Sequence, residues 1–287
     1  KGIFLDAMDF NGNNGICIGD PIALDSSGKK YFYVITTNDA GESWQAVSMD
    51  AMPVASTDEE ASFSASGSNI FLFDKGSKYH YAFVTGGKMS HLNFIGKNKR
   101  HNKSYVTPVH QGIASAGVFS MAFDGNKNWY VVGGDYKQPN NTENNFAGKQ
   151  INDANWNAAT TPPNGYRSCI RWMQKNKLIS CGTNGVDMSN DNGNNWMKAS
   201  DTGFNVCMVS PNKKLVFLFL CKTTNIFSAS FSIIGISLFN LLIFTLEFAI
   251  LFSIVAFLSY NALISFKASL YFNLFSANFL ASSSLSL

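Results

Sequence analysis

Five polar residues lie beside short strand-like segments of the chain, where they could take part in acid–base chemistry or bind a carbohydrate. They are Asp20, Glu60, Asp135, Tyr136 and Arg167. Carboxyl and phenol groups can exchange protons with a substrate, and carboxylates also accept hydrogen bonds from sugar hydroxyls. A guanidinium group binds an anion at two points. We predict all five as binding residues, and Glu60, Asp135, Tyr136 and Arg167 as the catalytic candidates if a reaction occurs.

Two uses of the carboxylates are open. Glu60 and Asp135 could act as the carboxyl pair that hydrolyses a glycosidic bond. Asp135 is favoured, however, as a structural group that accepts hydrogen bonds from backbone N–H groups or pairs with Arg167.

Motifs that bind common cofactors are missing from the sequence. No G-x-G-x-x-G loop opens a helix after a strand, and the chain has no P-loop and no haem or flavin motif. We therefore predict no cofactor.

The five cysteines lack the spacing of a metal site. None belongs to a C-x-x-C pair, and no histidine lies at metal-ligand spacing from them. Cys17, Cys169 and Cys207 lie within apolar segments, which predicts buried thiols that pack as small apolar side chains. A disulfide between Cys169 and Cys181 stays open. We predict no metal ion.

The elements that must position these residues recur along the first 214 residues. Four short apolar segments, residues 15–19, 81–87, 129–134 and 178–182, contain or end in glycine. Their β-branched and aromatic residues are typical of buried strands. The glycines Gly19, Gly86, Gly133 and Gly182 are 67, 47 and 49 residues apart. Such a period is typical of β-propeller blades, so we predict an all-β, incomplete propeller of about four blades over residues 1–214.

Two eight-residue segments share one pattern of polar, glycine and tryptophan residues. They are Thr37-Asn-Asp39-Ala-Gly41-Glu-Ser-Trp44 and Ser189-Asn-Asp191-Asn-Gly193-Asn-Asn-Trp196. In a hairpin, the Asp can accept N–H groups of its own turn, the Gly can adopt a positive φ and the indole can cover the sheet edge. The pattern resembles the Asp-box (BNR) motif of the sialidase superfamily. We predict a structural role for it.

Six further segments resemble the Ycf48/Hcf136-like BNR-repeat proteins, whose bacterial secreted members often carry the label oxidoreductase. They are residues 4–10, 15–21, 60–67, 115–123, 133–139 and 163–168, in that family's order. The resemblance implies a secreted or periplasmic propeller with additional blades before Lys1. It also implies a non-enzymatic binding or scaffold role, as in the relatives that help to assemble photosystem II. The partner would be a protein or a glycan at the propeller face.

A glycan-acting hydrolase, with acidic residues at the mouth of the central channel, is the alternative function. Sialidase chemistry itself is disfavoured, because it needs three arginines from different blades. This chain has Arg100, Arg167 and Arg171, and the last two are only four residues apart. The formal net charge is +3, from 22 basic and 19 acidic residues. Nucleic-acid binding needs more strongly clustered positive charge, so we predict no nucleic-acid partner.

Composition changes abruptly after residue 214. Residues 215–287 hold 13 of the 25 Phe, one Gly and three charged residues, Lys222, Glu247 and Lys267. The apolar stretch 226–266 has the length of two membrane spans, 226–246 and 248–266. Its repeated Phe, Leu, Ile and Ser are also typical of an AT-rich gene translated out of frame. We predict a hydrophobic tail over residues 215–287 that is either a membrane anchor or such an artefact.

Overall fold

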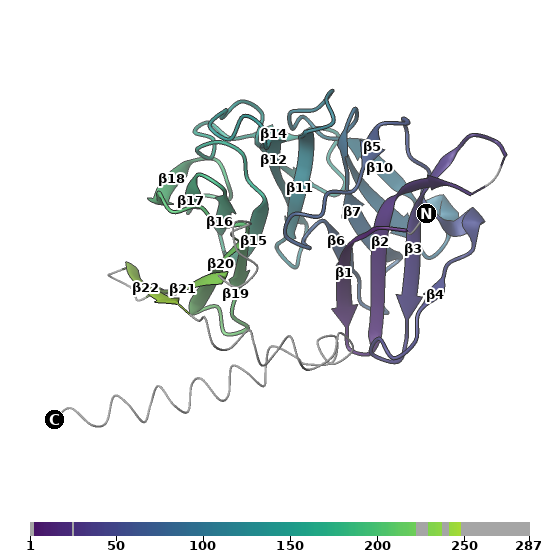
Figure 1. Cartoon of the computed structure of the whole chain (residues 1–287), viewed down its shortest axis with the longest axis horizontal. Coiled ribbons are helices and arrows are strands. Elements are labelled where there is room, and N and C mark those ends of the chain that lie inside the picture. The colour runs from purple at the N-terminus through teal and green to yellow at the C-terminus, as the bar shows by residue number, and fades with distance from the viewer. Residues whose placement is uncertain (1–2, 25, 222–228, 237–240, 248–287) are drawn as a thin grey trace.

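Strands make up most of the regular structure of this protein. The computed structural model describes residues 3–24, 26–221, 229–236 and 241–247. Within them, two short 3-10 helices, η1 (Met49–Ala51) and η2 (Lys99–His101), lie in connecting loops. Five antiparallel sheets follow one another along the chain. Figure 1 shows these sheets in an arc, from β1–β4 at one end to β19–β22 at the other.

Each blade is built on four antiparallel strands, and the third sheet has two further strands. The first has β1 (Leu5–Asn11), β2 (Asn14–Ala23), β3 (Lys30–Thr37) and β4 (Gln45–Ala46). The second has β6 (Ile70–Leu72), β7 (Tyr79–Val84), β9 (His91–Gly96) and β10 (Lys103–Val106). The third has β11 (Ala116–Phe123), β12 (Asn128–Asp135), β13 (Phe146–Gln150) and β14 (Asn157–Ala158), extended beside β11 by β8 (Gly86–Gly87) and β5 (Glu60–Ala61). The fourth has β15 (Cys169–Gln174), β16 (Lys177–Gly182), β17 (Gly185–Ser189) and β18 (Trp196–Ser200). The fifth has β19 (Val206–Val209), β20 (Leu215–Cys221), β21 (Ala229–Ile236) and β22 (Leu241–Glu247).

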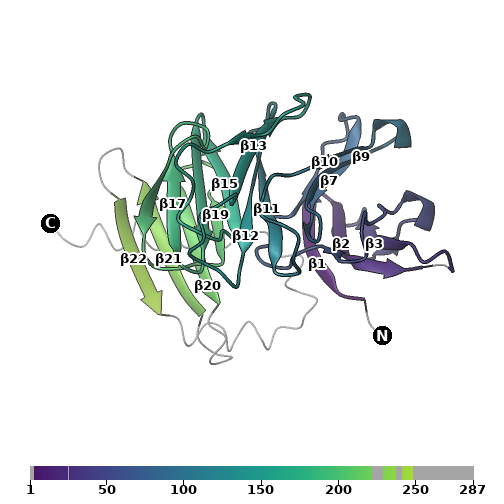
Figure 2. The same ribbon diagram turned by 90° about the horizontal axis from the view of Figure 1, so that it is seen from above.

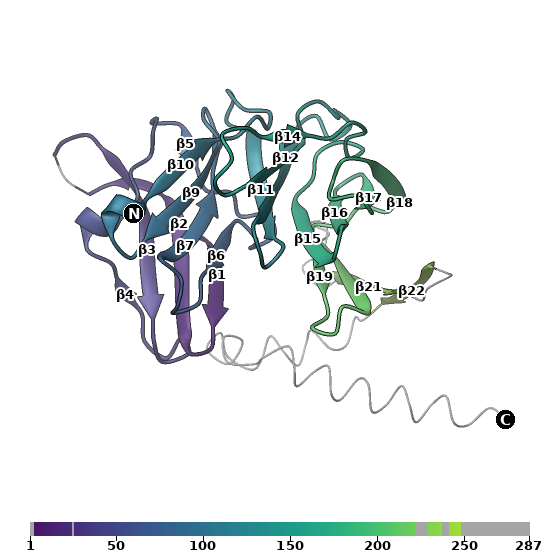
Figure 3. The same ribbon diagram turned by 180° about the vertical axis from the view of Figure 1, so that it is seen from behind.

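The first strands of the sheets lie along the inside of the arc. β15 contacts both β11 and β19, β1 contacts β6, and Met121 in β11 donates its N–H to the carbonyl of Ser68 just before β6. Figure 3 shows the same order from behind, and from above the sheets stand one behind another (Figure 2). Consecutive four-stranded antiparallel sheets arranged in this way form a β-propeller. The predicted fold class is confirmed.

The described residues form five blades, and the sequence predicted about four. The additional blade is β19–β22, whose second strand β20 lacks the glycine found in the second strands of the first, third and fourth blades. The predicted boundary at residues 214 and 215 falls at the start of β20, which pairs with β19. The origin of residues 215–287 stays a prediction, and much of the predicted spans 226–246 and 248–266 lies outside the described residues.

Membrane spanning was predicted only for residues 226–266. Among the described residues, no helix has the length and apolar character that a membrane span requires.

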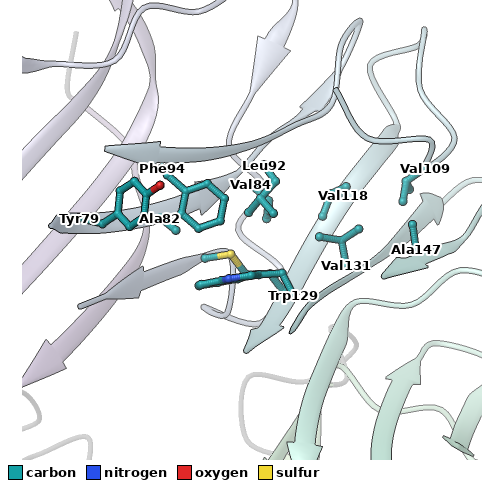
Figure 4. Packing of buried hydrophobic residues seen from close by; sticks show 11 residues of the cluster. Tyr79, Ala82, Val84, Leu92, Phe94, Val109, Val118, Trp129, Val131 and Ala147 are labelled. Carbon is teal, nitrogen blue, oxygen red and sulfur yellow. The ribbon is translucent and has the colours of Figure 1, made fainter. Parts of the chain in front are cut away.

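Four clusters of buried apolar side chains lie between the sheets, one for each pair of consecutive blades. The cluster between the second and third blades centres on Trp129 (Figure 4). Its rings stack on Phe123 with centroids 4.5 Å apart and meet Phe94 edge-on at 5.0 Å. Because each cluster is shared by two sheets, each blade depends on its neighbours for burial.

The second strands of the first, third and fourth blades carry glycines, Gly19, Gly133 and Gly182, where two stretches of backbone meet. A Cβ atom on Gly19, Gly133 or Gly182 would overlap a carbonyl oxygen. These oxygens belong to Phe4, Gly117 and Tyr166, each at or just before the first strand of the same blade. The glycine period in the sequence therefore reflects a close approach of the first two strands, repeated from blade to blade.

We expect Gly133→Ala to lower the free energy of unfolding by about 3 kcal/mol, because backbone must move to admit the methyl group. Gly76→Ala is the matched control, since nothing lies within 4 Å of its Cβ position. It should change stability by less than about 0.5 kcal/mol. Urea denaturation followed by tryptophan fluorescence measures both. Equal losses in the two variants would contradict the close-packing explanation.

The first Asp-box forms the turn between β3 and β4. Thr37 Oγ1 accepts the N–H of Gly41 at 3.1 Å, and Asp39 accepts the N–H of Ser43 at 3.0 Å. Gly41 has a φ of 95°, which favours glycine. Hydrogen bonds from Ser43 and Thr37 hold the pKa of Asp39 below its usual range. The indole of Trp44 meets the ring of Phe10 edge-on, with centroids 5.7 Å apart.

The second Asp-box repeats this arrangement between β17 and β18. Ser189 Oγ accepts the N–H of Gly193 at 2.9 Å, and Asp191 accepts the N–H of Asn195 at 2.8 Å. Gly193 has a φ of 86°. The indole of Trp196 is buried and donates to the carbonyl of Gly193 at 3.0 Å. The carboxylates of both boxes thus bond within their own turns, between the two outermost strands of a blade.

Candidate functional site

Four of the five predicted site residues lie at the end of the propeller that holds Gly19 of β2, Gly133 of β12 and Gly182 of β16, which we call the glycine face. Asp20 accepts the N–H of Ser62 at 3.2 Å, which links the first blade to the segment after β5. Glu60 lies in β5, which pairs through β8 with the start of β11. Asp135 pairs with Ala116 at the same end of β11, and Tyr136 follows it.

Arg167 completes this set. It precedes β15, and its N–H donates to the carbonyl of Gly133 in the neighbouring blade at 3.0 Å. The sequence-predicted residues therefore come together at one end of the propeller. They differ sharply, however, in what their polar atoms can still bind.

Glu60 is buried and its carboxylate is fully occupied. Oε1 accepts from Thr85 Oγ1 at 2.5 Å and lies 2.8 Å from Nδ1 of His91, while Oε2 accepts from the N–H and hydroxyl of Ser56 at 2.6 and 2.7 Å. Burial acts to raise the pKa of Glu60, but the hydrogen bonds from His91, Thr85 and Ser56 outweigh it and lower the pKa. This carboxylate braces the second and third blades.

Asp135 is also buried and holds the loop that follows β12. Its oxygens accept from the N–H of Lys137 at 2.9 Å and from Nε2 of Gln138 at 3.1 Å. These bonds offset the effect of burial and lower the pKa of Asp135. The sequence left two structural partners of Asp135 open, backbone N–H groups and Arg167. In the structure its partners include a backbone N–H group, that of Lys137. Arg167 pairs elsewhere.

Arg167 is fully buried in an ion pair with Asp187 of β17. Nε donates to Asp187 Oδ2 at 2.6 Å, and a second guanidinium nitrogen bonds the same oxygen. The remaining donor reaches Asn184 Oδ1 at 2.5 Å and the carbonyl of Tyr166 at 2.8 Å. Asn164 donates two bonds to Asp187. The guanidinium therefore presents no free edge to a ligand.

Sequence reasoning did not single out Asp187. The available signal was a carboxylate between Val186 and Met188 in an apolar strand, where an aspartate is rarely buried without a partner. No pattern in the sequence connects it with Arg167, which lies 20 residues earlier.

An aromatic strip of four side chains, Phe63, Phe119, Tyr136 and Tyr166, lies at the glycine face, with Phe119 and Tyr166 buried beneath it. Phe63 stacks on Phe119 with centroids 4.1 Å apart. Phe119 in turn meets Tyr166 edge-on at 4.9 Å and Tyr136 at 6.2 Å. Tyr136 is 49% exposed and forms the open end of the strip. Phe63 adjoins Ser62, whose N–H bonds to Asp20. The strip therefore continues into the carboxylate of the first blade.

A pair of acidic residues, Asp6 and Asp20, stands at the first-blade end of this strip. Burial, reinforced by the charge of Asp20, raises the pKa of Asp6 to about 7. Asp6 Oδ2 is buried without a hydrogen-bond partner. Burial also raises the pKa of Asp20, although the N–H of Ser62 opposes this. Sequence reasoning missed Asp6, which lies where the register of β1 shifts between Leu5 and Ala7.

A groove of about 510 Å³ lies at the opposite end of the first three blades. Its walls include Asp9, Phe10, Phe71, Phe73, Asp74 and Phe123. Asp9 accepts the N–H of Leu72 at 2.7 Å, and Asp74 accepts from the amide of Asn11 at 2.6 Å. These carboxylates join the walls of the groove to each other, so the glycine face remains the stronger candidate.

The fold is a β-propeller, and aromatic and acidic side chains, most of them buried, gather at one end of it. No protein-family model matches the chain, and no curated protein matches it. Among solved structures, it is similar to an ancestral GH74 enzyme, with 14% identity over 84% of this chain and 31% of that one, and a TM-score of 0.49.

Two other similarities are a Trypanosoma rangeli sialidase mutant that displays trans-sialidase activity and the Kuenenia stuttgartiensis hydrazine synthase. The first has 11% identity, covers 81% of this chain and 46% of that one, and has a TM-score of 0.41. The second has 14% identity, covers 56% and 46%, and has a TM-score of 0.38. This chain spans less than half the length of all three structures. At these values the fold assignment rests on the sheet topology of the chain itself.

Proposed function

We propose that this protein is a non-enzymatic binding propeller, and that its glycine face is the binding surface. One observation carries the proposal. Glu60, Asp135 and Arg167, the groups best suited to chemistry, are buried in internal hydrogen bonds, whereas Tyr136 is exposed at the end of the aromatic strip. A surface of this kind can hold a partner but has few free groups that could exchange protons with it.

The exposed residues near this face favour a protein partner over a glycan. Phe4, Leu5 and Ile113 are 61%, 40% and 44% exposed, and they lie at the starts of β1 and β11, where those strands approach the glycine face. Together with Tyr136 they offer apolar and aromatic area, the composition typical of protein interfaces. Membership of the Ycf48/Hcf136-like BNR-repeat proteins, and a location outside the cytoplasm, are part of this proposal and rest on the sequence resemblance.

Site-specific photocrosslinking tests the surface. A photoreactive phenylalanine at Tyr136 should give one defined adduct when the full chain is expressed in its native host. The same residue at Met197, which is 61% exposed on the outermost strand of the fourth blade, is the matched control and should give none. Mass spectrometry of the adduct identifies the partner. Equal adducts from both positions would contradict a specific binding face.

A glycan-acting hydrolase is the second candidate, and the acidic pair at the first blade favours it. A carboxyl with a pKa of about 7, beside a second carboxyl, has the proton affinity that a general acid needs. If the protein hydrolyses a glycan, Asp6→Asn and Asp20→Asn should each abolish turnover on an oligosaccharide panel, while the variants stay folded. Turnover of that kind would overturn the non-enzymatic proposal.

A further inference from the structure

Three cysteine thiols converge between the fourth and fifth blades. Cys169 in β15 stands opposite Cys181 in β16, and Cys207 lies in β19 of the next blade. Their sulfur atoms all lie within 4.8 Å of one another. All three are fully buried free thiols, which confirms the predicted burial of Cys169 and Cys207. Packing thus gathers three soft donor atoms from three strands at one point.

The surroundings of this thiol cluster (Cys169, Cys181 and Cys207) are apolar, with one positive charge. The cluster belongs to the core that Ile179, Val186 and Val216 also form. The guanidinium of Arg171 interacts electrostatically with all three sulfur atoms and with the carboxyl group of Asp9. The hydroxyl of Ser68 lies 3.7 Å from the Sγ of Cys169.

We propose that Cys169, Cys181 and Cys207 bind a soft d¹⁰ metal ion, of the class that contains Cu(I) and Zn²⁺. Thiolates are the ligands these ions prefer. Metal–sulfur bonds of about 2.3 Å place the sulfur atoms of one ion roughly 4 Å apart. The three thiols therefore reach a common ion through side-chain shifts of less than about 1 Å.

Zn²⁺ and Cu(I) differ in charge and in the number of ligands that they require. Binding replaces three S–H bonds by three metal–sulfur bonds and releases three protons to solvent. Three thiolates with Zn²⁺ leave one negative charge, which Arg171 can balance. Zn²⁺ also prefers a fourth ligand, whereas Cu(I) needs only the three thiolates. The Ser68 hydroxyl, 3.7 Å from the Cys169 sulfur, already bonds to the hydroxyls of Ser66 and Ser120, so the donor set favours Cu(I), and a titration distinguishes the two ions.

A metal titration of the full chain tests the site. The reduced, metal-free protein is titrated with Zn²⁺ against a chromophoric chelator and with Cu(I) against bicinchoninate. We expect one ion per chain, and we expect Cys169→Ser and Cys207→Ser each to weaken binding by more than about 100-fold. Cys17→Ser removes a buried thiol of β2, outside the cluster, and should leave the affinity unchanged.

X-ray absorption spectroscopy on the unmutated, metal-loaded chain tests the site even if a serine variant fails to fold. The expected signal is a shell of three sulfur atoms at about 2.3 Å. A shell of nitrogen and oxygen ligands, or no bound ion in the reduced protein, would overturn the proposal. So would a disulfide between Cys169 and Cys181 that persists under reducing conditions and shows as the loss of two hydrogens in the intact mass.

Discussion

Replacing Arg167 by methionine should lower the free energy of unfolding by about 3–5 kcal/mol, because the variant leaves the carboxylate of Asp187 buried without a counter-charge. Both side chains of this pair are 0% exposed. The loss reflects the stranded charge more than the attraction of the pair, since two charges removed from water gain little net stability. Urea denaturation followed by tryptophan fluorescence gives the value.

Two further variants separate the stranded charge from other effects of Arg167→Met. The double variant Arg167→Met with Asp187→Leu should recover much of the loss, because no charge then remains buried. Lys198→Met breaks an ion pair with Asp201, whose side chains are 43% and 89% exposed, and should change stability by less than about 1 kcal/mol. An Arg167→Met variant as stable as Lys198→Met would show that this pair does not brace the fold.

Asp6 should make the protein less stable as the pH rises from about 4 to 7. Its pKa is raised from 3.8 to about 7 on folding, so the native state binds a proton that the unfolded state has already released in this window. The carboxyl therefore favours the native state below pH 4, and that advantage is lost progressively up to pH 7. One pKa unit corresponds to about 1.36 kcal/mol, which gives a total of about 4 kcal/mol.

Asp6→Asn should remove this contribution and make the variant more stable than the unmodified chain at pH 8. Urea denaturation at one-unit pH steps measures the difference between the two proteins. Asp9 and Asp20, whose pKa values burial also raises, remain in both. Glu143→Gln changes an exposed carboxyl and is the control, with a profile that should follow the unmodified chain. Parallel profiles for Asp6→Asn and the unmodified chain would show that Asp6 titrates normally.

The two predicted functions make opposite demands on this carboxyl. A binding propeller tolerates Asp6→Asn and gains stability from it at neutral pH. A hydrolase that uses Asp6 as its acid would lose its reaction in the same variant, which is the exchange of stability for activity that strained sites show. Measuring both quantities on one protein therefore decides between the two proposals for the glycine face.

Local patterns in the sequence were sufficient to predict the fold. The Asp-box turns close within eight residues, so Thr37, Asp39 and Gly41 contain all the groups that the first turn needs. Gly19, Gly133 and Gly182 recur because the same backbone approach recurs in the first, third and fourth blades. The fifth blade was not predicted, because β20 lacks such a glycine. In addition, β20 begins inside a stretch whose composition is typical of a membrane segment.

Tertiary structure alone decided which polar groups are free. The sequence placed Arg167 and Glu60 at the right end of the propeller, but their partners Asp187 and His91 lie 20 and 31 residues away. Partners at such separations are chosen by how neighbouring strands pair and how blades pack, which no short pattern encodes.

The same holds for the three thiols, which come from three strands of two blades and share no spacing motif. By itself, the sequence determined an all-β propeller, its Asp-box turns and the end where polar residues gather. The pairing of the charged side chains was decided by burial. A charged side chain removed from water needs a partner, and only the packed structure shows which partner it has.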